Sequence, residues 1–156
     1  MKYFSKSLKV NQTLINLDLS HNQIGDEGIE ELSEALKVNQ TLTNLDLSKT
    51  GIRAKGVLYL SQALKINRTL TVLDLSCNRM YYYENTEDQE TNIQEFIQSL
   101  KINKSIIKLN IDGNEINRKD LNKIDNLIKR NSQFSKKVNQ ISPRRRFAII
   151  PRINSN

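Results

Sequence analysis

One seven-residue segment recurs along the 156 residues of this chain. Residues 8–14 and 36–42 both have the sequence LKVNQTL, residues 64–70 have LKINRTL, residues 100–106 have LKINKSI, and residues 128–134 have the divergent copy IKRNSQF. Successive segments therefore begin 28, 28, 36 and 28 positions apart. A sustained period of this size indicates a stack of equivalent structural units, and it constrains the fold more strongly than any local pattern.

The first half of each unit has the spacing L-x-x-L-x-L and ends at a turn position. In the first complete unit, Leu14, Leu17 and Leu19 have this spacing and Asn22 ends it. Apolar residues that alternate, as at Leu17 and Leu19, are typical of a short strand with one buried face. The spacing recurs three more times, at Leu42, Leu45, Leu47 and Thr50, at Leu70, Leu73, Leu75 and Asn78, and at Ile106, Leu109, Ile111 and Asn114.

The second half of each unit has helical spacing. In the segment IGDEGIEELSEALKVN, the apolar residues Ile29, Leu32 and Leu36 lie on one face of a predicted helix. Asp26 is predicted to cap its first turn, and Asn39 to end it in a left-handed conformation. The repeated segment is therefore the end of a helix and the turn that leads into the next strand.

The sequence LDLSHNQIGDEGIEELSEALKVNQTL resembles the leucine-rich repeat family. It is most similar to the ribonuclease-inhibitor-like subclass, which also occurs in NOD-like receptors and in Ran GTPase-activating protein. The resemblance covers residues 1–131 and implies a right-handed α/β leucine-rich repeat solenoid, with parallel strands on the concave side and helices on the convex side. Members of the family mostly bind other proteins.

The predicted array spans residues 1–131 and consists of a half unit followed by four units. It starts with a helix alone, and the pattern fails after Phe134. Thr50 stands where the other units have Asn, whose amide bonds the backbone of the turn in the family that this chain resembles. Because Thr can replace only part of that bonding, we predict a looser turn in the second unit.

The third unit contains eight extra residues, within the segment YYYENTEDQETN at residues 81–92. We predict that most of them lengthen the helix, and that Tyr81, Tyr82 and Tyr83 occupy the connecting loop. Because Tyr is frequent among residues that dominate protein interfaces, one interpretation is a protruding contact site. In the alternative interpretation, the tyrosines fold back over the longer helix.

The concave strand face is the other predicted contact surface. Neighbouring strands lie about 4.8 Å apart, so Asp18, Asp46 and Asp74 form a row of like charges. This row is either an acidic strip that awaits basic groups of a partner, or a structural feature that only forms hydrogen bonds within the sheet. The side chains predicted to face a partner here are Asn16, Asp18, Ser20, Asn44, Asp46, Ser48, Val72, Asp74, Lys108 and Asn110.

Catalysis has little support in the sequence. His21 is the only histidine and Cys77 the only cysteine, and both are expected in turns. There is no Cys/His cluster with metal-ligand spacing and no Gly-rich phosphate loop. We therefore predict that the chain is not an enzyme and that it has no cofactor and no small-molecule substrate. A single cysteine, together with the lack of a signal peptide or a membrane-spanning segment, favours a cytoplasmic location, with a nuclear one as the alternative.

The net charge of +7 is concentrated at the C-terminal end of the chain. Residues 128–156 contain eight basic residues and no acidic residue, so residues 132–156 are predicted to be a basic cap or tail. Three interpretations fit this segment: a cap in which Phe147, Ile149 and Ile150 cover the open end of the array, a site for nucleic acid or anionic membrane, or a nuclear localisation signal.

Together these observations predict a non-catalytic module that binds another protein through the concave strands and residues 81–92. The alternative is a module that binds a polyanion, nucleic acid or anionic membrane, through the basic tail. Self-association through exposed ends of the solenoid is a further hypothesis.

Deletion of residues 142–156 distinguishes the interpretations of the tail. If the segment is a cap, its removal exposes apolar surface at the end of the array, and we expect a clear fall in the melting temperature. A thermal melt followed by circular dichroism measures this. An unchanged melting temperature contradicts the cap and favours the other two interpretations.

Overall fold

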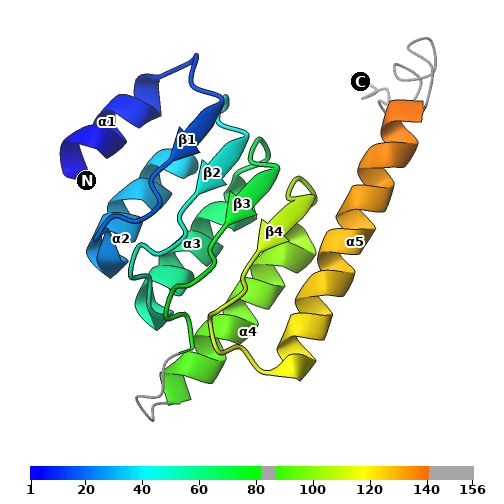
Figure 1. Ribbon diagram of the computed structural model, residues 1–156. Helices are drawn as coiled ribbons and strands as arrows, with labels where there is room; N and C mark the ends of the chain where they lie inside the picture. The colour runs from blue at the N-terminus through cyan, green and yellow to red at the C-terminus, as the bar shows by residue number, and fades with distance from the viewer. Residues whose placement is uncertain (82–86, 141–156) are drawn as a thin grey trace, which may run out of the picture.

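A computed structural model describes residues 1–81 and 87–140 of the chain. Helices and three-residue strands alternate in the order α1 (Lys2–Val10), β1 (Asn16–Asp18), α2 (Gly25–Leu36), β2 (Asn44–Asp46), α3 (Ala54–Ile66), β3 (Val72–Asp74), α4 (Glu87–Ile102), β4 (Lys108–Asn110) and α5 (Arg118–Gln140). The strands form one parallel sheet in the order β1-β2-β3-β4, and the helices form a second layer beside it (Figure 1).

The two layers explain the curvature of the array. Strands lie about 4.8 Å apart, whereas packed helices need about 8–10 Å, so a stack of such units curves with the sheet on the inside. The predicted α/β leucine-rich repeat solenoid is confirmed.

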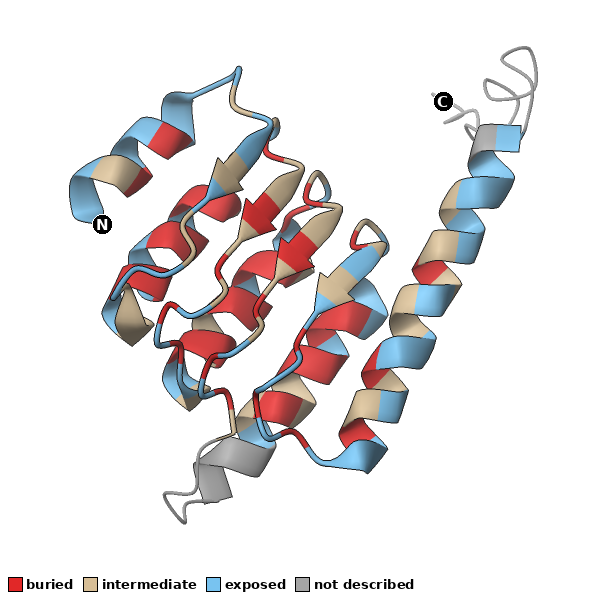
Figure 2. Cartoon of the chain, viewed as in Figure 1, coloured by how far each residue is buried: buried red, intermediate tan, exposed pale blue. Residues whose placement is uncertain are grey.

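The register of the strands is the one that the repeat period predicts. Leu17 pairs with Leu45, Leu45 with Leu73, and Leu73 with Leu109. The inner pair is buried, whereas Leu17 and Leu109 are half-buried because each end strand has only one neighbouring strand. The buried residues lie between the sheet and the helices and form a continuous core (Figure 2). The leucines that the repeat predicts on the buried face of each strand therefore line up along the array.

Asn39 does not end its helix in a left-handed conformation, so that prediction is wrong. Its side chain is buried and joins two units instead. The Nδ2 atom donates to the carbonyl oxygens of Leu8 (2.9 Å) and Asn11 (3.1 Å) in the preceding unit. The Oδ1 atom accepts the backbone N–H groups of Thr41 (3.0 Å) and Leu42 (2.8 Å) in its own turn.

The same arrangement recurs in the units that follow. Asn67 donates to the carbonyls of Leu36 and Asn39, and Asn103 donates to the equivalent carbonyls one unit later. We call this series the asparagine ladder; its members are Asn11, Asn39, Asn67, Asn103 and Asn131. A buried amide is costly unless it is hydrogen-bonded, and here one side chain satisfies backbone groups of two units. The ladder is why the segment LKVNQTL is repeated.

The turn after each strand has a left-handed residue at one equivalent position, held by His21 (φ 57°), Lys49 (φ 53°), Cys77 (φ 53°) and Gly113 (φ 72°). Further left-handed residues follow at Gly25, Gly51 and Glu115. A second series of hydrogen bonds crosses the units next to the first of these positions. Asn78 Nδ2 donates to the carbonyls of Leu75 (2.9 Å) and Leu47 (2.8 Å), one in its own turn and one in the preceding turn.

Thr50 replaces only part of this bonding, as the sequence predicts. Its Oγ1 donates to the carbonyl of Leu47 in its own turn (2.6 Å). Within the described residues, Thr50 makes no side-chain bond to the Leu19 carbonyl of the preceding unit. Asn78 Oδ1 accepts the backbone N–H of Thr50 (3.0 Å), so the following unit supports this turn. Whether the turn is looser than its neighbours stays a prediction.

Asp26 does not cap its own helix, which contradicts the sequence-based assignment. The N-cap residue of α2 is Ile24, and no side chain caps it. Asp26 Oδ1 instead accepts the backbone N–H of Arg53, the N-cap residue of α3, at 2.8 Å. The carboxylate therefore bonds the backbone of the next unit, because consecutive helices lie side by side in the stack. Asp26 Oδ1 also lies close to the backbone of Gly56. A Cβ atom at position 56 would lie only 2.5 Å from this oxygen, which is why that position suits glycine.

Part of the insertion lies in α4. Within the described residues α4 has 16 residues and α3 has 13, a difference of three. Residues 82–86, directly before α4, lie outside the described residues, so the lengthening of the helix by most of the eight extra residues stays a prediction. Tyr81 is partly buried and packs against the core, as in the fold-back interpretation. Tyr82 and Tyr83 lie outside the described residues.

The last helix continues where the other units turn. α5 runs without a break from Arg118 to Gln140 and passes residue 131, where the sequence predicts the end of the array. The ladder residue Asn131 still donates to the carbonyls of Asn103 (3.2 Å) and Ile106 (2.8 Å). Its Oδ1, however, accepts the guanidinium of Arg130 (2.8 and 3.1 Å) and no longer the N–H groups of a turn. The division at residue 131 stays a prediction, and residues 141–156 lie outside the described part of the chain.

Substitution of a ladder residue tests whether the ladder stabilises the stack. Asn67→Ala removes bonds to Leu36 and Asn39 and leaves the N–H groups of Thr69 and Leu70 unpaired. We expect the free energy of unfolding to fall by about 3 kcal/mol, because each unsatisfied buried polar group costs about 1–3 kcal/mol. Urea denaturation measures this.

Asn11→Ala is the matched control. Asn11 is exposed at the first unit, and its Oδ1 accepts only the N–H groups of Thr13 and Leu14. We expect a loss of about 1 kcal/mol. Equal losses for the two variants contradict a stabilising role of the bonds between units.

Candidate functional site

The concave face of the sheet contains a shallow groove. It has a volume of about 380 Å³ and crosses strands β1, β2 and β3. β4 lies directly beside it, since Lys108 pairs with Val72 and Asn110 with Asp74. The residues that line the groove are Asn16, Leu17, Asp18, Asn44, Leu45, Asp46, Val72 and Asp74. The fold therefore brings six of the predicted contact residues into one groove and two more to its edge.

The three aspartates lie in register, and each makes the same kind of local hydrogen bond. Asp18 pairs with Asp46 and Asp46 with Asp74 along the sheet. The Oδ1 atom of each accepts the backbone N–H of the serine two residues later in its own unit, at 2.8–2.9 Å. Each aspartate thus shapes the turn that follows its strand. In addition, Asn110 Nδ2 donates to Asp74 Oδ2 across the strands (2.9 Å).

These bonds lower the pKa of two of the carboxyl groups. Hydrogen bonds from the side chain and the backbone of Ser20 hold the pKa of Asp18 below its ordinary value. Burial raises the pKa of Asp74, but hydrogen bonds from Ser76 and Asn110 outweigh it, and the pKa of this group is also lowered. Donors that bond the charged form stabilise it, so both carboxylates remain negative at neutral pH.

The structural bonding leaves acceptor atoms for a partner. Among the described residues, Oδ2 of Asp18 and Oδ2 of Asp46 have no hydrogen-bond donor, and both side chains lie on the strand face that points away from the core. The two interpretations of the aspartate row are thus compatible, because one oxygen of the carboxylate holds the turn while the other faces outward. The row is negative toward β1, and on β4 it continues at the neutral Asn110, while Lys108 lies two residues away beside Val72.

The remaining predicted contact residues are not in the groove. Ser20 and Ser48 lie in the turns after β1 and β2, where their N–H groups bond the aspartates. Tyr81 packs against the core and is not among the residues that line the groove. Tyr82 and Tyr83 are outside the described residues, so the contribution of residues 81–92 stays a prediction.

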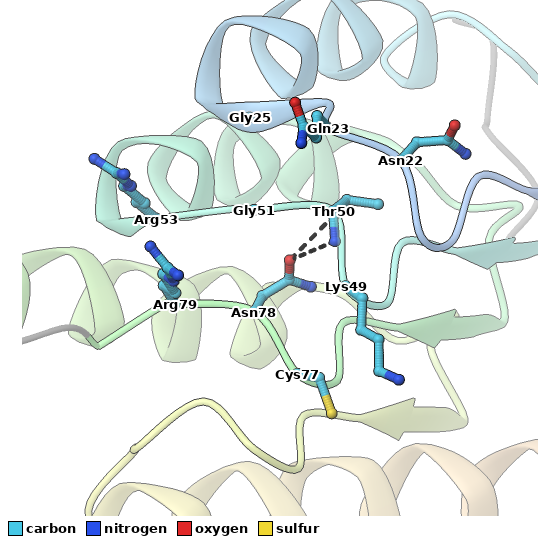
Figure 3. Close-up of a pocket in the computed structure, with 10 residues that line it drawn as sticks. All are labelled: Asn22, Gln23, Gly25, Lys49, Thr50, Gly51, Arg53, Cys77, Asn78 and Arg79. Atoms are coloured by element: carbon cyan, nitrogen blue, oxygen red, sulfur yellow. Dashed lines mark hydrogen bonds between the residues drawn. The ribbon is translucent and has the colours of Figure 1, made fainter.

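A second pocket lies at the turns that follow the strands, and the sequence did not predict it. It has a volume of about 540 Å³ (Figure 3). In Figure 3, Lys49 extends away from Arg53 and Arg79, so the three cations do not converge on one point. The pocket arises where equivalent turn positions of adjacent units meet, and aligning the units could have revealed it. Its lining residues are Asn22, Gln23, Gly25, Lys49, Thr50, Gly51, Arg53, Cys77, Asn78 and Arg79.

The described residues contain no group of three or more His, Cys, Asp or Glu side chains arranged to hold a metal ion. Cys77 is a free, exposed cysteine at the left-handed position of its turn. None of the helices in the described part of the chain is both long and apolar enough to span a membrane.

Comparison with known proteins agrees with the fold. A family model described as leucine-rich repeat matches residues 10–33, 38–61 and 67–80. No curated protein sequence matches the chain significantly. The chain therefore carries leucine-rich repeats, although nothing in these matches singles out the ribonuclease-inhibitor-like subclass.

The solved structures that are similar to this chain include the following two. Leiomodin-1 actin-binding site 2 has 26% sequence identity and a TM-score of 0.73, with 93% of this chain and 78% of that chain covered. The tropomodulin C-terminal domain of Caenorhabditis elegans has 12% identity and a TM-score of 0.53, with coverage of 85% and 96%. At that identity, the second likeness shows the fold alone.

The lowered pKa of Asp74 predicts a dependence of stability on pH. Because the pKa is lower in the folded state, ionised Asp74 stabilises the fold above its ordinary value of 3.8, and this contribution is lost as the pH falls toward the folded-state value. In Asp74→Asn, the side-chain oxygen can still accept the Ser76 N–H but does not titrate. We expect the unfolding free energy of this variant to fall less steeply between about pH 4 and pH 2, as measured by urea denaturation. Identical slopes for the two proteins contradict the hydrogen-bonded carboxylate.

Proposed function

We propose that this chain is a non-catalytic protein-binding module whose partner lies against the concave strand face. One observation carries the proposal: Asp18, Asp46 and Asp74 lie in register along a groove on that face. A like-charged row costs electrostatic energy in the free protein, and basic groups of a partner would relieve it. We propose residues 81–92 as a second contact segment of the same partner.

The geometry of the face supports binding with little reordering. Its side chains are short, and the aspartates are already held by the N–H groups of the following turns. The asparagine ladder fixes the spacing of the strands beneath them. Because a preorganised surface loses little conformational entropy on association, even a modest groove can contribute useful affinity.

The charge distribution of the face favours a partner with basic groups toward β1. Asp18 and Asp46 each have one carboxylate oxygen available, whereas Asp74 uses both of its oxygens within the sheet. Lys108 adds a positive charge at the other end, beside β3. A partner with Arg or Lys over β1 and β2 and an acidic or neutral group over β4 would fit this polarity.

Actin is the first partner to test. Leiomodin-1 actin-binding site 2, which is similar over 93% of this chain, is named for binding actin. The proposal takes the chain to act in the cytoplasm and to have no substrate of its own. Self-association, and polyanion binding through the basic tail, stay predictions.

Charge reversal at the centre of the aspartate row tests the proposal. We expect Asp46→Lys to weaken binding to purified actin at least about tenfold, which corresponds to roughly 1.4 kcal/mol. Glu31→Lys is the matched control, because it makes the same change of charge at an exposed position of α2, on the helical side of the array. We expect less than about a twofold effect there. Anisotropy titration of labelled chain with actin measures both.

Asp46→Asn shows whether a loss of binding reflects misfolding. The amide oxygen can still accept the Ser48 N–H, so we expect a melting temperature near that of the wild type together with weaker binding. If the wild-type chain does not bind actin, actin is rejected as the partner. The wild type, Asp46→Lys and Glu31→Lys are then used as baits to capture proteins from a native lysate. If folded Asp46→Lys captures as much protein as Glu31→Lys, the concave face is overturned as the binding site.

A further inference from the structure

A row of exposed aliphatic side chains crosses the edge of the solenoid at which the helices end. Each lies directly before a ladder asparagine, so the same position is occupied in four successive units. Scattered single apolar residues on a surface are normal, but an apolar residue repeated at one exposed position forms a contiguous strip. We call it the aliphatic row; its members and their exposed fractions are Val10 (78%), Val38 (54%), Ile66 (55%) and Ile102 (49%).

The row is held rigidly. The ladder asparagine that follows each member bonds the preceding unit, as Asn39 bonds the Leu8 carbonyl and Asn67 the Leu36 carbonyl. The stacking of the units therefore sets the distance between neighbouring members of the row. We expect this distance to lie between the strand spacing of about 4.8 Å and the helix spacing of about 8–10 Å. The result is a row of apolar side chains at the C-terminal ends of successive helices.

Positive charge flanks the row on both sides. A lysine precedes every member, and Arg68 and Lys104 follow the third and fourth members by two residues. No acidic residue occurs in residues 9–16, 37–45, 65–73 or 101–111, which form this edge. Burial, and to a smaller extent the nearby positive charge of Arg130, lower the pKa of Lys104. The lysines that precede the row are Lys9, Lys37, Lys65 and Lys101.

Two of these lysines form ion pairs among the described residues. Lys37 contacts Glu34 and Lys65 contacts Glu95. Arg68 and Lys104 donate to the last carbonyls of their helices, including those of Lys65 and Lys101. Helix capping thus explains part of the positive charge. It does not explain why the aliphatic side chains between these cations are exposed.

The extension of α5 continues this surface. The helix proceeds past Asn131, so residues 132–140 project beyond the edge at which the other helices end (Figure 1). Phe134 is 61% exposed and Val138 37% exposed on this projection, one helical turn apart. Lys136 and Lys137 lie beside them, again without an acidic neighbour in the sequence. The aliphatic row therefore ends at a second apolar and positively charged element.

We propose that the aliphatic row and the α5 extension bind an acidic amphipathic helix of a partner protein. An apolar strip flanked by lysine and arginine side chains, of which Lys37 and Lys65 are paired with Glu34 and Glu95, fits a helix that has an apolar stripe and carboxylates on either side of it. The apolar residues of such a helix recur every turn, about 5.4 Å apart, which lies within the spacing range of the row. A nucleic acid would use the cations but not the aliphatic side chains. This surface is separate from the concave face.

A designed peptide tests the proposal directly. The probe is a labelled helix of about 20 residues with Leu at heptad positions a and d and Glu at most other positions, titrated into the full chain and followed by anisotropy. We expect saturable binding and increased peptide helicity. Val38→Ser with Ile66→Ser removes two members of the row without changing the charge, and we expect at least about tenfold weaker binding. Both side chains are about half exposed, so the melting temperature should change little.

Controls separate the row from general attraction by charge. Tyr3→Ser removes another exposed apolar side chain, which is 84% exposed on α1, and should leave the affinity within about twofold. Polyglutamate of equal length and a single-stranded 20-nucleotide DNA should bind at least about tenfold more weakly than the peptide. The proposal is overturned if the peptide does not bind, if Val38→Ser with Ile66→Ser binds as tightly as the wild type, or if polyglutamate or DNA competes equally well.

Discussion

The asparagine ladder is the interaction on which the rest of this structure depends. Each helix must end and the chain must turn before it enters the sheet, and the turn buries backbone groups that water can no longer reach. One buried amide satisfies N–H groups of its own turn and carbonyls of the preceding unit, as at Asn39 and Asn67. The bond between units is thus built from the same side chain that shapes each unit. A single unit lacks these partners, which is why the sequence must repeat the segment in phase.

The sequence predicted those features that depend on periodicity. Leucines that recur every 28 residues, such as Leu17 and Leu45, gave the parallel register and the apolar core directly. It could not predict whether a polar side chain bonds the backbone of its own unit or that of a neighbouring unit. Asp26 has the spacing of a cap for its own helix, yet it accepts the N–H of Arg53 at the start of α3 because the helices of neighbouring units lie close together. Asn39 was mistaken for a helix stop for the same reason, since its partners are a unit away.

The end of the array shows how one substitution changes this pattern. Arg130 occupies the position that belongs to Val or Ile in the other units, and its guanidinium bonds the Oδ1 of Asn131. At Asn39, Asn67 and Asn103 that oxygen accepts N–H groups of a turn, whereas α5 continues as a helix past Asn131. The residues most relevant to function also follow the repeat. The aspartates of the concave face and the aliphatic row at the edge both exist because a unit copies its structural residues and its surface residues together.

If the ladder couples the units, the array should unfold as one body. Native-state hydrogen exchange tests this at Leu42, Leu70 and Ile106, whose backbone N–H groups each donate to a ladder asparagine in a different unit. We predict that the three amides exchange with the same free energy of opening, equal to that of global unfolding measured by denaturant. Three distinct free energies, each well below the global value, would mean that the units open one at a time and would contradict the account.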